Sequence, residues 1–140
     1  WGRNHYGQTS PPALTPGDSW ADVDAGFHHT CGITTTGDAH CWGWNNAGST
    51  SVPDLNPGTQ WRDIEAGWYH TCGLTTADNV QCWGYAGQGQ TAVPTLKNGS
   101  RWSAISAGYL HTCALTTAGK VECWGLNDRG QSDVPSGLSE

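Results

Sequence analysis

The 140-residue sequence contains no methionine, a single phenylalanine, and few charged side chains, which make up only 13% of it. Apolar runs long enough for a membrane-spanning helix are absent, so we expect no membrane partner. Lysine and arginine are scarce and unclustered, and the formal net charge is −6, which argues against nucleic acid as a partner. Because residue 1 is Trp rather than Met, we expect a processed form or a part of a longer protein.

Tryptophan, glycine and cysteine, in contrast, are abundant and periodic. Trp20, Trp61 and Trp102 open three segments that repeat every 41 residues without insertion or deletion. A fixed period of this length indicates one supersecondary unit copied in tandem. We therefore expect a leading segment and three repeats, with the boundaries 1–19, 20–60, 61–101 and 102–140. Trp1-Gly2 aligns with Trp42-Gly43, so the leading segment resembles the tail of a preceding repeat.

Each repeat predicts four short strands, here numbered in the middle copy. Residues 61–66 alternate apolar and acidic side chains, which indicates a half-buried strand. Residues 70–75 and 80–83 follow, joined by a three-residue turn that needs positive φ at its last position, which Gly37, Asp78 and Gly119 tolerate. Residues 90–93 are the fourth expected strand, and Pro94 ends it.

The six cysteines occur as two per repeat, with nine residues between them. Fifteen pairings are conceivable, but the repeat and the turn favour pairing within each copy, and each bridge would then contribute up to about 3 kcal/mol. The expected bridges are Cys31–Cys41, Cys72–Cys82 and Cys113–Cys123. Such a framework is typical of an oxidising compartment, so we expect a secreted, extracellular protein.

Four antiparallel strands in about 40 residues, marked by glycines and aromatics, are typical of a β-propeller blade. The predicted fold is therefore all-β. It has three full four-stranded blades and an extra N-terminal strand formed by residues 1–12.

The string G-x-x-H-T-C-[GA]-[LI]-T-T-x-G-x-x-x-C-W-G-x-N-x-x-G-Q resembles the regulator-of-chromosome-condensation repeat. The resemblance covers nearly the whole chain and is strongest to the extracellular, cysteine-containing branch, which includes bacterial secreted members and Crinkly-type receptor ectodomains. It implies propeller blades, usually seven to a ring. The chromatin binding and nucleotide exchange of the founding member depend on particular loops, and no motif here carries those roles over.

Three blades cannot close a ring, because propellers typically have four to eight. The open lateral faces would expose aromatic surface. We therefore expect either a longer array or an oligomer, and a filament is conceivable if residues 1–12 complete a neighbouring molecule.

The sequence offers two candidate chemical sites. His29, Cys31 and Cys41, with their equivalents in the other repeats, could supply three zinc ligands, but bridged cysteines and a buried structural histidine are the favoured interpretation. Asp22-x-Asp24 and Asp63-x-Glu65 resemble paired carboxylates on a solvated strand face. No catalytic residue, metal or cofactor is predicted, and the protein is not expected to be an enzyme.

Ligand recognition is expected where the repeats differ, at loops that follow strand ends. The candidate ligand or interface residues are Phe27, His28, Trp44, Trp68, Tyr69, Tyr85 and Tyr109. Asn98 begins an N-glycosylation sequon, so the protein is expected to be a glycoprotein. The favoured function is a structural or protein-binding module that pairs with itself, with neighbouring repeats or with an extracellular protein. The alternative is a secreted lectin whose aromatic side chains stack on glycans.

Overall fold

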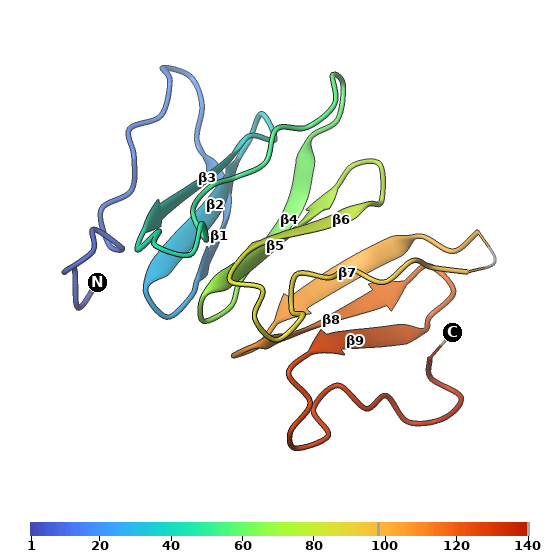
Figure 1. The fold of residues 1–140 in the computed structure, drawn as a ribbon. Coiled ribbons are helices and arrows are strands. Elements are labelled where there is room, and N and C mark those ends of the chain that lie inside the picture. Colours follow the sequence, from blue (N-terminus) through green and yellow to red (C-terminus); the bar gives the residue numbers. More distant parts are fainter. Residues whose placement is uncertain (98, 140) are drawn as a thin grey trace.

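The computed structural model describes residues 1–97 and 99–139, which form nine strands and, within those ranges, no helix. The strands form three antiparallel sheets of three, each in the order of the sequence. Blade 1 consists of β1 (Trp20–Ala25), β2 (His29–Thr34) and β3 (Ala39–Gly43), blade 2 of β4 (Trp61–Ala66), β5 (His70–Thr75) and β6 (Val80–Gly84), and blade 3 of β7 (Trp102–Ala107), β8 (His111–Thr116) and β9 (Val121–Gly125). The blades follow one another as an open fan, with the chain ends on opposite sides (Figure 1).

The predicted hairpin turn joins the second and third strands of every blade. Gly37, Asp78 and Gly119 have φ of 83°, 59° and 73°, the left-handed values that the turn requires. In blade 1 the Gly37 amide donates to the Thr34 carbonyl at 2.9 Å. This turn sets the register of the hairpin and therefore decides which cysteines face each other.

The predicted disulfides are present in all three blades. Cys31 lies directly opposite Cys41, Cys72 opposite Cys82 and Cys113 opposite Cys123. Each pair has a Cα–Cα distance of 4.1 Å, nearer to the about 4.5 Å of the closely spaced cross-strand pairs than to the about 5.5 Å of the widely spaced ones. All six cysteines are bridged, so each blade is closed by its own covalent link.

The predicted fourth strand at residues 90–93 and the predicted N-terminal strand at residues 1–12 were wrong. Neither segment is a strand: residues 90–91 belong to a turn and 92–93 are irregular, and residues 1–12 are irregular with turns at 5–6 and 8–9. Their amides bond locally. Ala92 N donates to Gly89 O at 3.0 Å and Val93 N to Thr91 O at 3.1 Å, and in the leading segment Ser10 N donates to Gly7 O at 2.9 Å. Because these amides are used within the segment, they cannot pair with a third strand, and the blades remain three-stranded.

The hydrophobic core lies between blades rather than within them. Between blades 1 and 2, a buried cluster joins the disulfide side of blade 1 to the tryptophan side of blade 2; its members are Cys31, Ile33, Trp61, Ile64 and Trp83. Between blades 2 and 3, the equivalent cluster contains Cys72, Leu74, Val80, Trp102, Ile105, Ala114 and Trp124. Each blade thus contributes a different half to the interface on each of its two sides.

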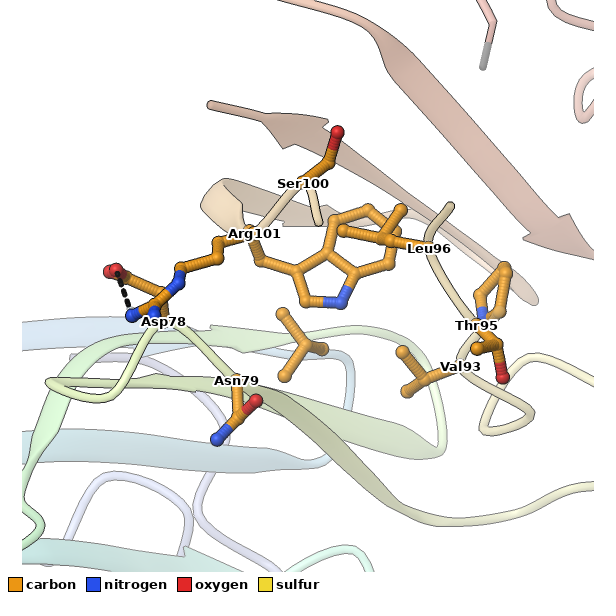
Figure 2. Close-up of a pocket in the computed structure, with 10 residues that line it drawn as sticks. Asp78, Asn79, Val93, Thr95, Leu96, Ser100 and Arg101 are labelled. Atoms are coloured by element: carbon orange, nitrogen blue, oxygen red, sulfur yellow. Dashed lines mark ion pairs between the residues drawn. The ribbon is translucent and has the colours of Figure 1, made fainter. Parts of the chain in front are cut away.

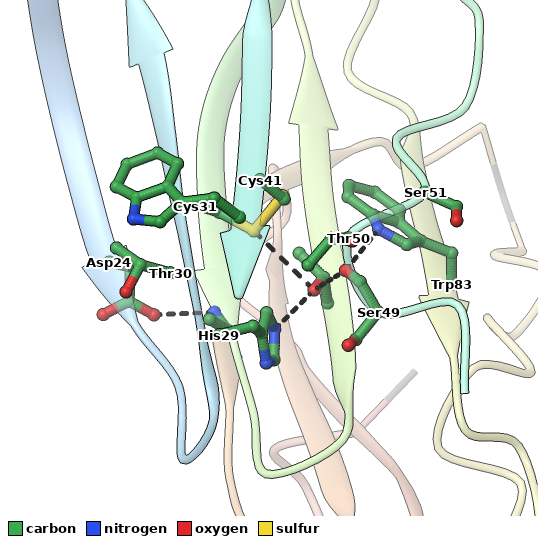
Figure 3. The surroundings of a disulfide bond; sticks show 12 residues. Asp24, His29, Thr30, Cys31, Cys41, Ser49, Thr50, Ser51 and Trp83 are labelled. Atoms are coloured by element: carbon green, nitrogen blue, oxygen red, sulfur yellow. Dashed lines mark hydrogen bonds between the residues drawn. A yellow bond between two sulfur atoms is a disulfide. The ribbon is translucent and has the colours of Figure 1, made fainter. Parts of the chain in front are cut away.

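A buried hydrogen-bonded network, here called the blade lock, crosses each interface beside the core (Figure 3). Thr71 Oγ1 donates to the Ser49 carbonyl at 2.8 Å and lies 2.8 Å from His29 Nε2. Since the Thr71 hydroxyl proton is donated to Ser49, the His29 Nε2–H donates to the Thr71 oxygen. Burial lowers the pKa of His29 to about 4, so at neutral pH its ring is uncharged with the proton on Nε2. Trp83 Nε1 donates to the same Ser49 carbonyl at 2.9 Å.

The lock recurs between blades 2 and 3. His70 Nε2 lies 2.9 Å from Thr112 Oγ1, which donates to the Gln90 carbonyl at 3.1 Å. Trp124 Nε1 donates to that carbonyl at 2.9 Å. In both locks, the preceding repeat gives a histidine and a backbone carbonyl, and the following blade gives a threonine and a tryptophan.

Candidate functional site

Three aromatic side chains at equivalent positions form a row where the first strand of each blade ends. Phe27, Trp68 and Tyr109 each follow an Ala-Gly pair that closes the turn to the next strand. The ring centroids of Phe27 and Trp68 are 5.0 Å apart, and those of Trp68 and Tyr109 are stacked at 3.8 Å. Together with the Ala-Gly pairs, these rings line an open hollow of about 460 Å³. The repeat therefore aligns its most variable aromatics on one surface.

The turn that carries each aromatic packs against the imidazole of the histidine that follows it. Gly67 N donates to His70 O at 2.9 Å, and a Cβ at Gly67 would meet the His70 ring. Gly26 and Gly108 are packed against His29 and His111 in the same way. Glycine is needed here because the imidazole occupies the space of a side chain. The row consequently rests on closely packed turns.

A second set of rings extends this row. His28 lies 4.3 Å from Phe27 and 6.2 Å from Tyr69 between ring centroids. Trp44 joins through Tyr69 at 4.9 Å, and Tyr69 stacks on Trp68 at 4.5 Å. Six of the seven aromatic positions expected from the sequence thus come together in one aromatic surface, formed by Phe27, His28, Trp44, Trp68, Tyr69 and Tyr109.

Two aromatics depart from the expectation. The Tyr85 ring lies against Gly87 in its own loop and, among the described residues, stacks on no ring of the aromatic surface, although its amide donates to Tyr69 O at 2.9 Å. Tyr6, which we did not predict, packs edge-on against His28 at 5.0 Å. Tyr6 lies on the leading segment, where the other repeats have Ala47, Gln88 and Arg129. Only its aromatic character, without any repeated pattern, could have indicated it.

The aromatic surface is accessible. Phe27 is 58% exposed and Tyr109 is 52% exposed. Desolvation, with a smaller effect of Tyr69, raises the pKa of Tyr109 above its usual value. Exposed rings with a few polar groups are typical of recognition surfaces.

The acidic residues of β1 and β4 lie near the junction between blades 1 and 2, and one of them bonds across it. Asp24 Oδ2 accepts a hydrogen bond from Ala66 N at 2.6 Å. Burial, and then the charges of Asp24 and Asp63, raise the pKa of Glu65 to about 7. Among residues 1–97 and 99–139, no group of three His, Cys, Asp or Glu side chains is arranged to hold a metal ion. Because all six cysteines are bridged, none offers the thiolate that a zinc site of this kind would need.

A polar hollow of about 380 Å³ lies at the opposite, hairpin-turn end of the junction between blades 2 and 3 (Figure 2). Asp78 forms ion pairs there with Arg62 at 2.7 Å and with Arg101 at 3.8 Å. An equivalent hollow at Gly37 to Trp61 occurs one repeat earlier. Because it recurs with the packing of the blades, we assign it to the scaffold. Asn98, the expected glycosylation site, lies outside the described residues.

The buried lock histidines should make stability depend on pH. Burial lowers the pKa of His29 and of His70 to about 4 from the ordinary 6.5, so between these values the unfolded chain binds more protons than the folded one. We expect the free energy of unfolding to rise as pH increases from 4 to 6.5. The raised pKa of Glu65 lowers the free energy of unfolding as pH increases from 4.5 to 7, which would mask the effect of the histidines. Denaturant titrations should therefore be made in the Glu65→Gln background, where this contribution is absent. Adding His70→Gln should remove about half of the rise; an unchanged slope would contradict the assignment.

No helix formed by the described residues is long and apolar enough to cross a membrane.

The sequence model of the regulator of chromosome condensation (RCC1) repeat matches the chain three times, at residues 20–49, 61–90 and 102–131. No curated protein sequence matches the chain.

Several solved structures are similar to the chain. The entire ectodomain of the Physcomitrella patens receptor kinase CR4 is 28% identical, with a TM-score of 0.73 over 98% of this chain and 37% of that one. The Crinkly WD40 ectodomain of the Arabidopsis thaliana receptor kinase ACR4 is 26% identical, with a TM-score of 0.60 over 83% and 41%. Yeast RCC1 (Prp20) bound to Kap60 shares the fold at 17% identity, with a TM-score of 0.71 over 84% and 34%. The chain thus spans at most 41% of each of these structures.

Proposed function

The chain belongs to the family of regulator of chromosome condensation (RCC1) repeat proteins, and from this premise we propose that it is a protein-interaction module without catalytic activity. Its recognition surface is the aromatic surface. The observation that carries the proposal is the contiguous row of Phe27, Trp68 and Tyr109, in which Phe27 and Tyr109 are exposed and Trp68 is half-buried between them. Aromatic anchors of this kind dominate the binding energy of protein interfaces.

The module acts outside the cell, as part of a larger assembly of blades. Three disulfides support an oxidising compartment. The receptor-kinase ectodomains that share the fold are consistent with that location. Yeast RCC1, crystallised with Kap60, is a relative in fold with a protein partner. The partner of this chain is an extracellular protein that presents apolar side chains to the row.

A photo-cross-linking amino acid at position 109, in the protein displayed in its native extracellular setting, tests this proposal. We expect a discrete protein adduct, because Tyr109 is half exposed within the row. The matched control places the same amino acid at the exposed Asp54, away from the aromatic surface. The same adducts at both positions, or no protein adduct at position 109, would contradict a protein-recognition role.

The alternative is a lectin, favoured by the stacked rings of Trp68 and Tyr109, because aromatic faces also stack on sugars. A glycan array distinguishes the two functions. Binding to a defined glycan that Trp68→Ala abolishes would favour the lectin, and no binding to any glycan would remove it.

A further inference from the structure

The two end faces of the fan are the two halves of the core that the blades share inside the chain. At both internal interfaces, a disulfide-side residue of one blade meets a tryptophan-side residue of the next. Ile33 and Ile64 are 4% and 1% exposed at the first interface, and Leu74 and Ile105 are 1% and 7% exposed at the second. This recurring contact defines what each end face is shaped to meet.

The C-terminal end face, on blade 3, has the disulfide-side half without its complement. Leu115, the equivalent of Leu74, is 40% exposed. With Cys113 and Val121 it borders an open, apolar hollow of about 210 Å³. The equivalent surface of blade 2 is covered by Trp102, Ile105 and Trp124 of blade 3.

The N-terminal end face, on blade 1, has the tryptophan-side half. Val23, the equivalent of Ile64 and Ile105, is 60% exposed. Trp20 and Trp42 pack on each other at 5.3 Å, as Trp61 and Trp83 do at 5.5 Å, but both are only half buried. The two end faces are therefore complementary to each other and not to themselves.

The polar lock is divided in the same way. His111 and the Gln131 carbonyl stand where His70 and the Gln90 carbonyl stand one repeat earlier, and no blade follows them in these 140 residues. At the other end, Thr30 and Trp42 already donate to the Gln8 carbonyl, at 2.8 and 3.0 Å. Thr30 thus lacks only the histidine of a preceding blade, and His111 is the group that would supply it.

We propose that blade 1 of a second copy docks head to tail on blade 3 of the first, forming a third lock between His111 of one copy and Thr30 of the other. The inference rests on the proposal that the chain works within a larger assembly of blades. The contact is heterologous, so two copies can close into a pair of six blades or continue as a chain. Six blades fall within the usual range of propellers.

Residues 1–12 and residues 124–135 are equivalent segments, so only one of them can occupy the new junction. Residues 1–6 are exposed, and Trp1 makes no buried contact. The leading segment is anchored to blade 1 mainly through the Gln8 carbonyl and the Tyr6–His28 contact. On docking, the Gln131 carbonyl of the first copy replaces the Gln8 carbonyl of the second, and residues 1–12 are released.

Two variants, each blocked at one end, test the proposal by analytical ultracentrifugation of the full chain. Leu115→Glu places a charge on the C-terminal end face and Val23→Glu on the N-terminal end face, both at positions exposed in the single chain. We expect the unaltered protein to associate into dimers or longer chains, and each variant alone to be a monomer. An equimolar mixture of the two should give a heterodimer and nothing larger, because one free end face of each kind remains.

Tyr85→Glu is the control, since it adds the same charge at an exposed aromatic position outside both end faces, and it should associate as the unaltered protein does. Non-reducing mass spectrometry and thermal unfolding verify that each variant is folded. A monomeric unaltered protein, self-association of either blocked variant, or a mixture that stays monomeric would overturn the proposal. Cross-linking at position 109 is independent of these variants, so failure of docking is distinguishable from failure of the recognition function.

Discussion

Replacing Trp83 by alanine is expected to lower the free energy of unfolding by about 3–5 kcal/mol, the usual range for a large aromatic removed from a core. Trp83 is 8% exposed and packs against Trp61 between blades 1 and 2. Its loss leaves a cavity beside the buried Ile33 and Ile64, and removes the donor to the Ser49 carbonyl. Guanidinium denaturation under non-reducing conditions measures the change.

Two controls separate the contributions to this loss. Trp83→Phe keeps most of the ring and removes the hydrogen bond; we expect a loss of about 1–2 kcal/mol, since Ser49 O still accepts from Thr71. Trp42→Ala makes the same deletion at the equivalent position of blade 1, where the ring is only half buried. Its effect should be clearly smaller than that of Trp83→Ala. Equal losses at Trp42 and Trp83 would show that the core does not lie between the blades.

The parts of the fold that depend on local chemistry could be predicted. Alternation in residues 61–66 and the positive-φ turn at Asp78 gave the first three strands of the blade, and the turn register gave the cysteine pairs. The error in the fourth strand has a non-local cause as well as the local amide bonds of the turn. The Gln90 carbonyl is bonded by Thr112 and Trp124, which lie 22 and 34 residues away. No pattern within residues 90–93 reveals that these side chains will reach it.

The candidate surface likewise has a part that the sequence predicts and a part that it does not. Phe27, Trp68 and Tyr109 could be predicted to share a surface, because the repeat places them at one position of every blade. Tyr85 also occupies a variable loop position, but the absence of a side chain at Gly87 lets its ring fold back on its own loop. Tyr6 joins the surface from outside the three repeats, so periodicity says nothing of it. Individual loop conformations thus limit what the repeat can predict.

The same periodicity supplies matched controls that a single-domain protein lacks. An internal residue and its equivalent at an end face have similar neighbours in sequence and the same strand register, but differ in whether an adjoining blade covers them. Comparing the two therefore isolates the contribution of packing between blades. The disulfides allow this comparison in its clearest form, because their three loops are of equal length.

Replacing Cys72 and Cys82 together by alanine should lower the free energy of unfolding by about 3 kcal/mol through loop-closure entropy alone, given their sequence separation of 10. The Cys72 side chain is also fully buried against blade 3, so its lost packing should add about 1 kcal/mol. Denaturant titration of the double variant, in parallel with the intact protein, gives the sum.

The Cys113→Ala/Cys123→Ala variant separates the loop-closure contribution from the packing contribution. Its loop has the same sequence separation of 10, so the entropic loss is equal, but Cys113 lies at the open end face and is only partly buried. We therefore expect this pair to be the less damaging of the two whenever the protein is monomeric. If blade 3 is covered by a second copy, the difference should shrink as protein concentration increases, because Cys113 then becomes as buried as Cys72. A difference of the opposite sign would refute the location of the core between blades.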